Sequence, residues 1–324
     1  MKPRVFITRP ISEKPLAMID AECEMEVWTG KTPPPIREKI AELDGLLTYG
    51  HEPVTAEIMD SAPKLKVIAN VGVGYDHIDV TAATERGISV GHTPGVLSET
   101  TADLAFALLL AAARNVVRGD RFIRGGQWKG YNPNLLWGAE VNGSTLGIIG
   151  LGRIGRAVAR RARGFDMTVL YHDCDRLPEW EERLAVQYVS LEDLLSQSDF
   201  VTIHTPLTRQ TRHLIGRKEL ARMRNTAVLI NTARGPVVDS KALYEALRDG
   251  VIAGAGLDVF EHEPLSTDDP LLTLDNVAVC PHLGSATVKT RTKMGVMAAE
   301  NLLAGLKGRP LPYPVNPEAC ERKR

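Results

Sequence analysis

The chain alternates between short runs of apolar and β-branched residues and longer segments in which apolar residues recur with helical spacing. This alternation is typical of parallel sheets that carry helices on both faces. In the first part of the chain, the pattern predicts strands at residues 5–7, 45–48, 66–69 and 89–90. A second series of six strands is expected at 145–149, 167–171, 200–203, 227–230, 254–257 and 277–279.

The segment between the two strand series predicts a helix over residues 102–117. A turn signal, Thr93-Pro94-Gly95, precedes it, and Thr100 and Asp103 match a capping pattern. The tail holds a further expected helix, 290–306, and is too short to form a domain, so we expect it to pack on the first one. The fold class is therefore α/β with two doubly wound domains, one of residues 1–98 plus 288–324 and one of residues 99–287.

Composition narrows the range of partners. The chain has 324 residues, of which 44% are hydrophobic and 24% charged, as in ordinary globular proteins, and this length favours two domains. A net charge of −1 and a pI near 6.7 provide no basic field, so we expect neither nucleic acid nor a membrane surface as a partner. The longest apolar run, 104–113, has about half the length of a membrane-spanning helix and is expected to be a buried helix.

The cysteines and the N-terminus favour a reducing compartment. The first residues run directly into an expected strand and lack the apolar stretch of a signal peptide. The cysteines are scattered without metal-ligand spacing, so we assign no metal site, expect buried free thiols and predict a cytoplasmic protein. They are Cys23, Cys174, Cys280 and Cys320.

A glycine-rich motif follows the expected strand at 145–149. Gly150, Gly152 and Gly155 fit the pattern G-x-G-x-x-G, and a helix is expected directly afterwards, at 156–163. The first glycine permits a tight turn, the second lets the backbone approach a pyrophosphate, and the third allows close packing of helix and strand. Backbone N–H groups and the helix dipole would then face the phosphates. The motif in this context indicates a dinucleotide site.

The next expected strand ends in an acidic residue near the spacing of a ribose ligand. Asp173 would accept hydrogen bonds from both ribose hydroxyls and would repel a 2′-phosphate, so NAD is favoured over NADP. NADP stays open because Arg176 follows three residues later and could reach a phosphate. The other interpretation of Arg176 is a solvated loop arginine.

Three side chains with complementary chemistry follow later strands of the second series. Reduction of a 2-keto acid requires a cation for the carboxylate, a proton donor, and a group that keeps the donor charged. Arg234 offers the planar guanidinium, Glu263 a carboxylate and His282 an imidazole. Each has an ordinary structural interpretation alone. Together, at the carboxyl edge of one nucleotide-type sheet, they indicate a catalytic site.

The chain resembles the D-isomer-specific 2-hydroxyacid dehydrogenases. The resemblance runs almost without a gap through residues 145–287 and extends to residues 70–79 and 101–104. It implies a Rossmann nucleotide-binding domain inserted into a flavodoxin-like substrate domain. It also implies an oxidoreductase that transfers a hydride between NAD(P)H and a small 2-keto acid, giving the D-2-hydroxy acid.

The resemblance implies roles for individual residues. His282 would be the general acid in reduction, Glu263 its partner, and Arg234 the group that binds the substrate. Backbone N–H groups around Val73 and Gly74 would hold the substrate carboxylate from the first domain. Tyr49 and Trp137 are further expected substrate contacts, and the shape of the pocket would depend on side chains such as Tyr49, His51, Tyr75 and Trp137. The implied cofactor contacts are Thr101, Gly150, Gly152, Arg153, Ile154, Gly155, Asp173, His204, Thr205, Pro206, Thr211, Thr232, Ala233, Asp258, His282 and Gly284.

Within the family, residues 284–287 and 301–306 look most like glyoxylate and hydroxypyruvate reductases, with 2-ketogluconate reductases near them. Trp137 sits where those enzymes send a loop across a dimer interface, so the resemblance implies a homodimer. A local core tryptophan is the alternative. Reductases of that subgroup often use NADP, whereas Asp173 favours NAD, so both cofactors stay open.

Two other functions are compatible with the same fold. An NAD-sensing, corepressor-like binding protein would keep the nucleotide site and act through partners, although Arg234, Glu263 and His282 favour an enzyme. A phosphite-type dehydrogenase would carry a lysine where Val73 stands.

Overall fold

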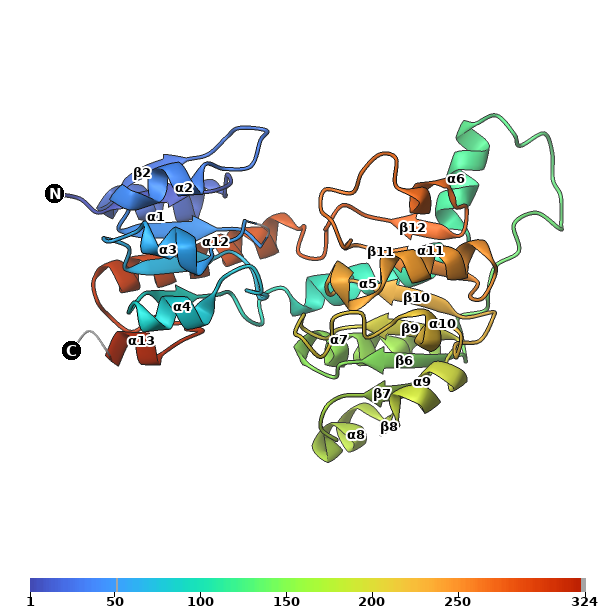
Figure 1. Cartoon of the computed structure of the whole chain (residues 1–324). Helices are drawn as coiled ribbons and strands as arrows, with labels where there is room; N and C mark the ends of the chain where they lie inside the picture. Colours follow the sequence, from blue (N-terminus) through green and yellow to red (C-terminus); the bar gives the residue numbers. More distant parts are fainter. Residues whose placement is uncertain (51, 322–324) are drawn as a thin grey trace. The chain divides into compact units, whose positions relative to one another are not determined.

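The computed structural model describes residues 1–50 and 52–321, excluding the side chains of Cys320 and Glu321. The chain divides into two compact units (Figure 1). Unit 1 comprises Met1–Leu97 and Ser285–Arg324, and unit 2 comprises Ser98–Gly284. His51 and the side chain of Cys320, both named above, lie outside the described residues.

Unit 1 is built on a parallel sheet of five strands in the order β2-β1-β3-β4-β5. This order is that of a flavodoxin-like doubly wound fold. Its strands are β1 (Arg4–Ile7), β2 (Glu24–Val27), β3 (Gly45–Thr48), β4 (Val67–Asn70) and β5 (Ser89–Gly91). Its helices are α1 (Glu13–Glu22), α2 (Ile36–Lys39), η1 (Ile40–Glu42), α3 (Ala56–Asp60), α4 (Val80–Glu85), α12 (Val288–Leu306) and α13 (Glu318–Glu321).

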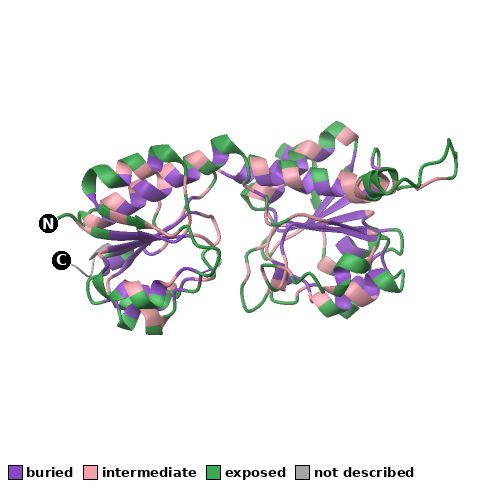
Figure 2. Cartoon of the chain, turned by 90° about the horizontal axis from the view of Figure 1, so that it is seen from above, coloured by how far each residue is buried: buried purple, intermediate pink, exposed green. Residues whose placement is uncertain are grey.

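Both faces of the unit 1 sheet are covered. On one face Phe6, Leu46 and Ile68 pack with apolar residues of α2, α3 and α4. On the other face α12 lies against β3 and β4, close enough that a methyl group on Gly45 would come within 2.8 Å of Leu302. Figure 2 shows the resulting layers, with buried strands between helices whose outer faces are exposed. Residues from both ends of the chain therefore share one core.

Unit 2 is built on a parallel sheet of seven strands in the order β12-β11-β10-β9-β6-β7-β8. The order reverses beside β6, as in a Rossmann fold. Its strands are β6 (Thr145–Ile149), β7 (Thr168–His172), β8 (Val186–Tyr188), β9 (Phe200–Ile203), β10 (Val228–Asn231), β11 (Gly254–Leu257) and β12 (Val277–Val279). Its helices are α5 (Ser98–Ala113), α6 (Val116–Arg124), α7 (Arg153–Ala162), η2 (Arg163–Phe165), α8 (Pro178–Leu184), α9 (Leu191–Gln197), α10 (Arg217–Leu220), η3 (Gly235–Val237), α11 (Ser240–Arg248) and η4 (Pro270–Thr273).

The sheet of unit 2 separates two apolar cores. One core joins α5 and α7 to strand residues such as Leu146 and Ile148. The other joins α9, α10 and α11 to Val201, Ile203 and Leu229. Because both faces are covered, the ligand-accessible part of such a sheet is the edge where the strands end.

The structure confirms the α/β class with two doubly wound units and corrects several elements. The expected helix 102–117 begins earlier and breaks at Asn115, whose φ of 52° is left-handed, so that α5 and α6 are separate. Thr100 lies inside α5 and does not cap it. β2 and β8 were not expected. Cys23 is buried as expected, whereas Cys174 is exposed and Cys280 half-buried.

Across the described residues, every helix taken singly is too short or too polar to cross a membrane. Only α5 and α6 together reach the required length and hydropathy, and their axes are bent by 61° at the break between them.

Candidate active site

The glycine turn lies between β6 and α7 and is tightly built. Gly150 has a φ of 94°, which favours glycine, and its N–H donates to the His172 carbonyl (2.8 Å). A methyl group on Gly155 would lie 2.1 Å from the Gly150 carbonyl oxygen, so only glycine fits there. A methyl group on Gly152, by contrast, would meet no atom within 4 Å, and this open side is where a pyrophosphate would approach. Helix α7 starts directly with Arg153 and Ile154.

Asp173 is oriented by the same turn. Its Oδ2 accepts the Leu151 N–H (2.7 Å), and its Oδ1 accepts the Cys174 N–H (2.8 Å). Arg176 is not free to serve a phosphate, because its guanidinium pairs with both oxygens of Glu181 (2.9 and 2.8 Å). That pairing lowers the pKa of Glu181 to about 2. The Asp173 carboxylate beside the turn is therefore positioned as a side chain that could bind the ribose of a nucleotide.

The loop after β9 closes the opposite side of the turn. A methyl group on Gly150 would come within 2.8 Å of the His204 carbonyl oxygen, so the two backbones are in contact. The Thr211 hydroxyl donates to the Pro206 carbonyl (2.6 Å) and closes the loop. Burial lowers the pKa of His204 to about 3, so its imidazole is neutral, and its Nε2 lies 2.9 Å from the Thr202 hydroxyl.

Several buried polar atoms in these loops fit a dinucleotide. In the described part of the chain, the His204 Nδ1, the Thr205 hydroxyl and the Thr232 hydroxyl are buried without a hydrogen-bond partner. They lie in the loops after β9 and β10, at the edge that holds the glycine turn. Buried polar groups usually have partners, so unused hydrogen-bonding capacity at this edge is what a bound nucleotide would take up.

The loop after β10 carries Arg234. The Asn231 side chain accepts the Ala233 N–H (3.0 Å) and donates to the Arg234 carbonyl (3.0 Å), which fixes the backbone around the guanidinium. A methyl group on Gly235 would lie 1.9 Å from the Phe260 carbonyl carbon. The Arg234 loop is therefore packed directly on the loop that leads to Glu263.

Asp258 holds the backbone of the histidine loop. Its carbonyl accepts the His282 N–H (2.9 Å), and its carboxylate accepts the N–H groups of Leu283 (2.6 Å) and Gly284 (2.8 Å). The Thr101 hydroxyl donates to the Gly284 carbonyl (3.1 Å) from α5. Burial raises the pKa of Asp258. Of the expected cofactor contacts, Asp258, Thr101 and Gly284 are thus joined in one network around His282.

His282 and Glu263 form a pair. The His282 Nδ1 lies 2.8 Å from the Glu263 Oε2, and the Glu263 Oε1 accepts the Phe260 N–H (2.9 Å). The Glu263 side chain is 17% exposed and that of His282 is 35% exposed, so the acid is shielded while the imidazole stays accessible. A carboxylate at Nδ1 fixes the tautomer and leaves Nε2 for proton transfer.

In unit 1, the expected substrate loop is rigidly held. Asn70 donates to the carbonyls of Gly72 (3.2 Å) and Gly74 (2.9 Å), and the His92 Nδ1 lies 3.0 Å from the Val73 carbonyl. These contacts fix the loop that carries the Val73 and Gly74 N–H groups. Tyr49 is half-buried, and burial raises the pKa of its phenol.

The comparisons with known proteins identify the family. Residues 106–284 match the NAD binding domain of the D-isomer specific 2-hydroxyacid dehydrogenases. The whole chain is 54% identical over 325 residues to a glyoxylate reductase of Korarchaeum cryptofilum, covering 99% of this chain and 98% of the relative. The chain belongs to the D-isomer specific 2-hydroxyacid dehydrogenase family.

Solved structures that are similar to this dehydrogenase have the same fold. A protein from Thermus thermophilus, TT0316, superposes with a TM-score of 0.90 at 48% identity, covering 96% of this chain and 99% of that one. An NADPH-dependent glyoxylate/hydroxypyruvate reductase from Sinorhizobium meliloti, solved with NADP and malonate, gives 0.87 at 34% identity, with 98% of each chain covered. The resemblance inferred from the sequence motifs is thereby confirmed, and this dehydrogenase is an oxidoreductase with an NAD-binding domain.

Two features of the dehydrogenase differ from what the sequence predicted. Trp137 is 76% exposed and its indole N–H donates to the Pro133 carbonyl (2.8 Å), so the alternative of a local core tryptophan is wrong. Glu52 was missed altogether: it is 6% exposed, and its carboxylate accepts the Tyr49 N–H (3.3 Å) and the Arg9 Nε–H (2.9 Å). The sequence gives no signal that Glu52 is buried. Its burial depends on pairing with Arg9, which only the fold brings close to it.

Proposed function

We propose that this dehydrogenase uses NADH to reduce glyoxylate to glycolate, which has no stereocentre, and hydroxypyruvate to the corresponding D-2-hydroxy acid. The observation that carries the proposal is the His282–Glu263 pair, 2.8 Å apart, in the unit that also presents Arg234 and the glycine turn at strand ends. Relatives that are glyoxylate reductases, 54% and 50% identical over nearly their full length, support this substrate class.

The reaction moves a hydride and a proton to one carbonyl. A bound reduced nicotinamide would supply the hydride to C2 of the keto acid. His282, protonated, donates from Nε2 to the carbonyl oxygen as negative charge develops there, and Glu263 stabilises the imidazolium before that transfer. In the reverse direction the neutral imidazole takes the proton from the hydroxyl.

Arg234 would bind the substrate carboxylate through its guanidinium and polarise the carbonyl. Backbone N–H groups of Val73 and Gly74 would serve the same carboxylate, with Tyr49 as a neighbour of the substrate side chain. The engagement of the Gly72, Val73 and Gly74 carbonyls by Asn70 and His92 supports this role.

NADH is the proposed cofactor, with NADPH as a weaker one. Asp173 is oriented by two backbone N–H groups, and its charge opposes a 2′-phosphate. Arg176, which could have served that phosphate, pairs with Glu181. The relative from Sinorhizobium meliloti is NADPH-dependent, so the comparison of both cofactors is part of the test.

A cytoplasmic homodimer is the proposed form of the enzyme. Exposed aromatic residues support a second copy as partner: Trp128 is 58% exposed, Tyr131 90% and Trp137 76%. Such side chains are typical of surfaces buried on association. The free thiols of Cys23, Cys174 and Cys280 support a reducing compartment, and the net charge of −1 supports a small acid rather than nucleic acid as ligand.

Following NADH absorbance with a panel of 2-keto acids tests the proposal. We expect turnover with glyoxylate and hydroxypyruvate, and a drop in kcat of roughly 10²- to 10⁴-fold in His282→Ala with little change in the Kd for NADH. Equal losses in kcat and in NADH binding would contradict the role of His282. Negligible turnover with every keto acid would favour the NAD-sensing alternative, and NAD reduction by phosphite would favour the phosphite-type one.

A further inference from the structure

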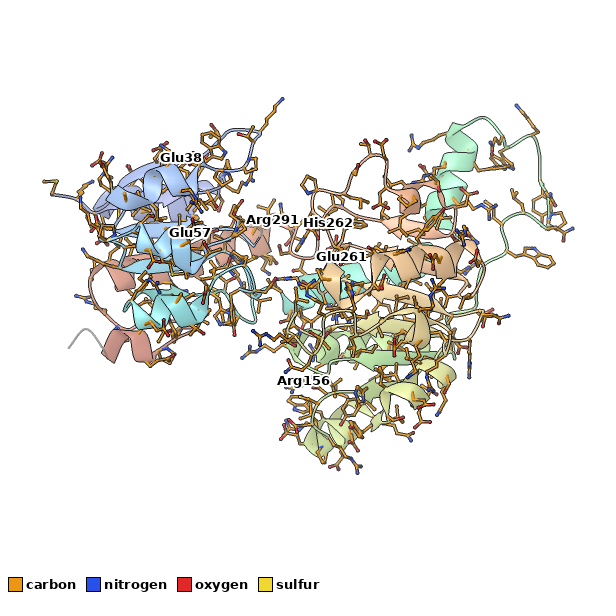
Figure 3. The ribbon with its side chains drawn as sticks, in the orientation of Figure 1. Glu38, Glu57, Arg156, Glu261, His262 and Arg291 are labelled. Atoms are coloured by element: carbon orange, nitrogen blue, oxygen red, sulfur yellow. The ribbon has the colours of Figure 1, made fainter. Side chains whose placement is uncertain are left out.

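Arg156 lies in the first turn of α7 and is labelled in Figure 3. Two different interactions hold its side chain. Its guanidinium carbon lies 4.0 Å from the ring centroid of Trp180, on α8, which is within the range of a cation–π contact. Its Nε–H donates to the Leu151 carbonyl in the glycine turn (2.9 Å). Arg156 thus connects α8 to the peptide between the first two glycines of the motif.

Leu151 connects Arg156 to Asp173, the proposed ribose-binding residue. Its side chain is fully buried (0% exposed), its carbonyl accepts from Arg156, and its N–H donates to the Asp173 Oδ2 (2.7 Å). Both polar groups of the residue are therefore engaged, one from each side. A shift of the Arg156 side chain would move the donor that orients the Asp173 carboxylate.

The hydrogen bonds of Asp173 leave room for a ribose. A carboxylate has about four lone-pair sites. Two accept the N–H groups of Leu151 and Cys174, and the Cys174 thiol, 3.2 Å from Oδ1, is a weak donor that a hydroxyl could replace. The remaining capacity equals two hydroxyl donors, which is the number that an unphosphorylated ribose offers.

We propose that Arg156 and Trp180 form a positioning pair that sets the Asp173 carboxylate for the ribose hydroxyls and so determines the preference for NADH over NADPH. The inference rests on the proposed function for its ligand, but the contacts belong to this chain. Neither residue is a catalytic residue, since both act through Leu151. Arg156 lies outside the set of cofactor contacts implied by the family resemblance.

Arg183 provides a matched control. It also lies on the Trp180 ring, 5.3 Å from the centroid, and it is exposed on α8. Among the hydrogen bonds of the described residues, however, none joins Arg183 to the glycine turn. Arg183→Met removes a cation from the same ring and leaves the connection to Leu151 intact.

The test compares Arg156→Met and Arg183→Met by calorimetric binding of NADH and NADPH and by hydrogen exchange of the ligand-free protein. In Arg156→Met we expect the Kd for NADH to rise about tenfold, as for loss of one charge-assisted hydrogen bond, with little change for NADPH. Exchange at the Leu151 amide should accelerate, and kcat at saturating NADH should stay near wild type. Arg183→Met should match wild type in all readouts.

Conservative variants keep the test decisive if Arg156→Met folds poorly. Trp180→Phe retains an aromatic face and should restore most of the NADH preference that Trp180→Ala loses. Equal weakening of NADH and NADPH, or an unchanged Leu151 amide in Arg156→Met, would overturn the positioning role. A wild-type protein that binds neither reduced cofactor would instead overturn the proposed function, which separates the two failures.

Discussion

His282 has an unusual backbone conformation. Its φ is 54°, a left-handed value that non-glycine residues adopt at some energetic cost. Asp258 compensates by accepting three consecutive N–H groups, those of His282, Leu283 and Gly284. The position of the proposed general acid therefore depends on a buried aspartate that lies 24 residues earlier in the chain.

Asp258→Asn tests this dependence. The amide nitrogen cannot accept a hydrogen bond, so one of the two N–H groups at the carboxylate loses its partner while the shape is kept. We expect the free energy of unfolding to fall by about 1–3 kcal/mol and kcat to fall by roughly tenfold or more. Chemical denaturation and steady-state kinetics measure both. A variant with normal stability and normal kcat would show that the network does not position His282.

The neutral His204 predicts a pH dependence of stability. Its pKa is about 3 in the folded chain, below the ordinary value of 6.5. Below pH 6.5 the unfolded chain takes up a proton that the folded chain refuses, so this contribution is lost as pH falls toward 3. The loss approaches about 1.4 kcal/mol per pH unit. Denaturation at pH 7 and pH 5 should show a smaller decrease in His204→Gln than in wild type.

At the scale of elements, the sequence pattern predicted strands best where they are buried on both faces. β3, β4, β9 and β10 are buried throughout and were expected within a residue or two. β2 alternates between exposed and half-buried positions, and only the first of the three residues of β8 is buried, so neither offers an apolar run. Their strand character comes from pairing with β1 and β7, which the sequence pattern cannot reveal.

The candidate site was predictable to the extent that it depends on strand ends. The glycine motif, Asp173, Arg234, Glu263 and His282 each follow a strand, and the structure puts them at such ends. The sequence pattern could not predict the contacts that hold these site residues in position. The bond from Arg156 to Leu151 joins positions five residues apart, but its stacking on Trp180 depends on how α8 packs.

Two glycines of the turn are required for different reasons: Gly155 for close packing of the backbone, and Gly152 for access of the cofactor. Gly155→Ala would place a methyl group 2.1 Å from a carbonyl oxygen, so we expect it to destabilise unit 2 by several kcal/mol (roughly 2–4). Gly152→Ala meets open space and should unfold like wild type while weakening NADH binding, since the methyl group would occupy the side facing the pyrophosphate. Thermal unfolding and calorimetry distinguish the two. Equal thermal stability of both variants would contradict this assignment.

At the scale of the whole molecule, unit 1 depends on hydrogen bonds between the two ends of the chain. Asn301, on α12, is fully buried, donates to the His92 carbonyl (3.0 Å) and accepts the Tyr313 N–H (2.9 Å). The Asn316 side chain similarly accepts the Val90 N–H (2.7 Å) and donates to the Ile88 carbonyl (3.0 Å). These amides attach the C-terminal segment to β5.

Asn301→Ala should therefore weaken unit 1 selectively. The truncation leaves the half-buried Tyr313 N–H and His92 carbonyl without the Asn301 side chain, for an expected loss of about 1–3 kcal/mol. Hydrogen exchange resolved along the chain should show faster opening within residues 1–97 and 285–321 and unchanged protection within 98–284. Equally faster exchange in unit 1 and in unit 2 would mean that the two units unfold together.

The discontinuity of unit 1 has a consequence for biosynthesis. A ribosome makes the chain from its N-terminus, so the strands β1 to β5 emerge long before α12, which covers one face of their sheet. Unit 2 is continuous in sequence, so it can complete its core before α12 is available to the unit 1 sheet. Until then, the face of that sheet that α12 covers is exposed. We therefore expect unit 2 to complete its fold before unit 1, and we expect the nascent protein to be most prone to aggregation until α12 has been synthesised.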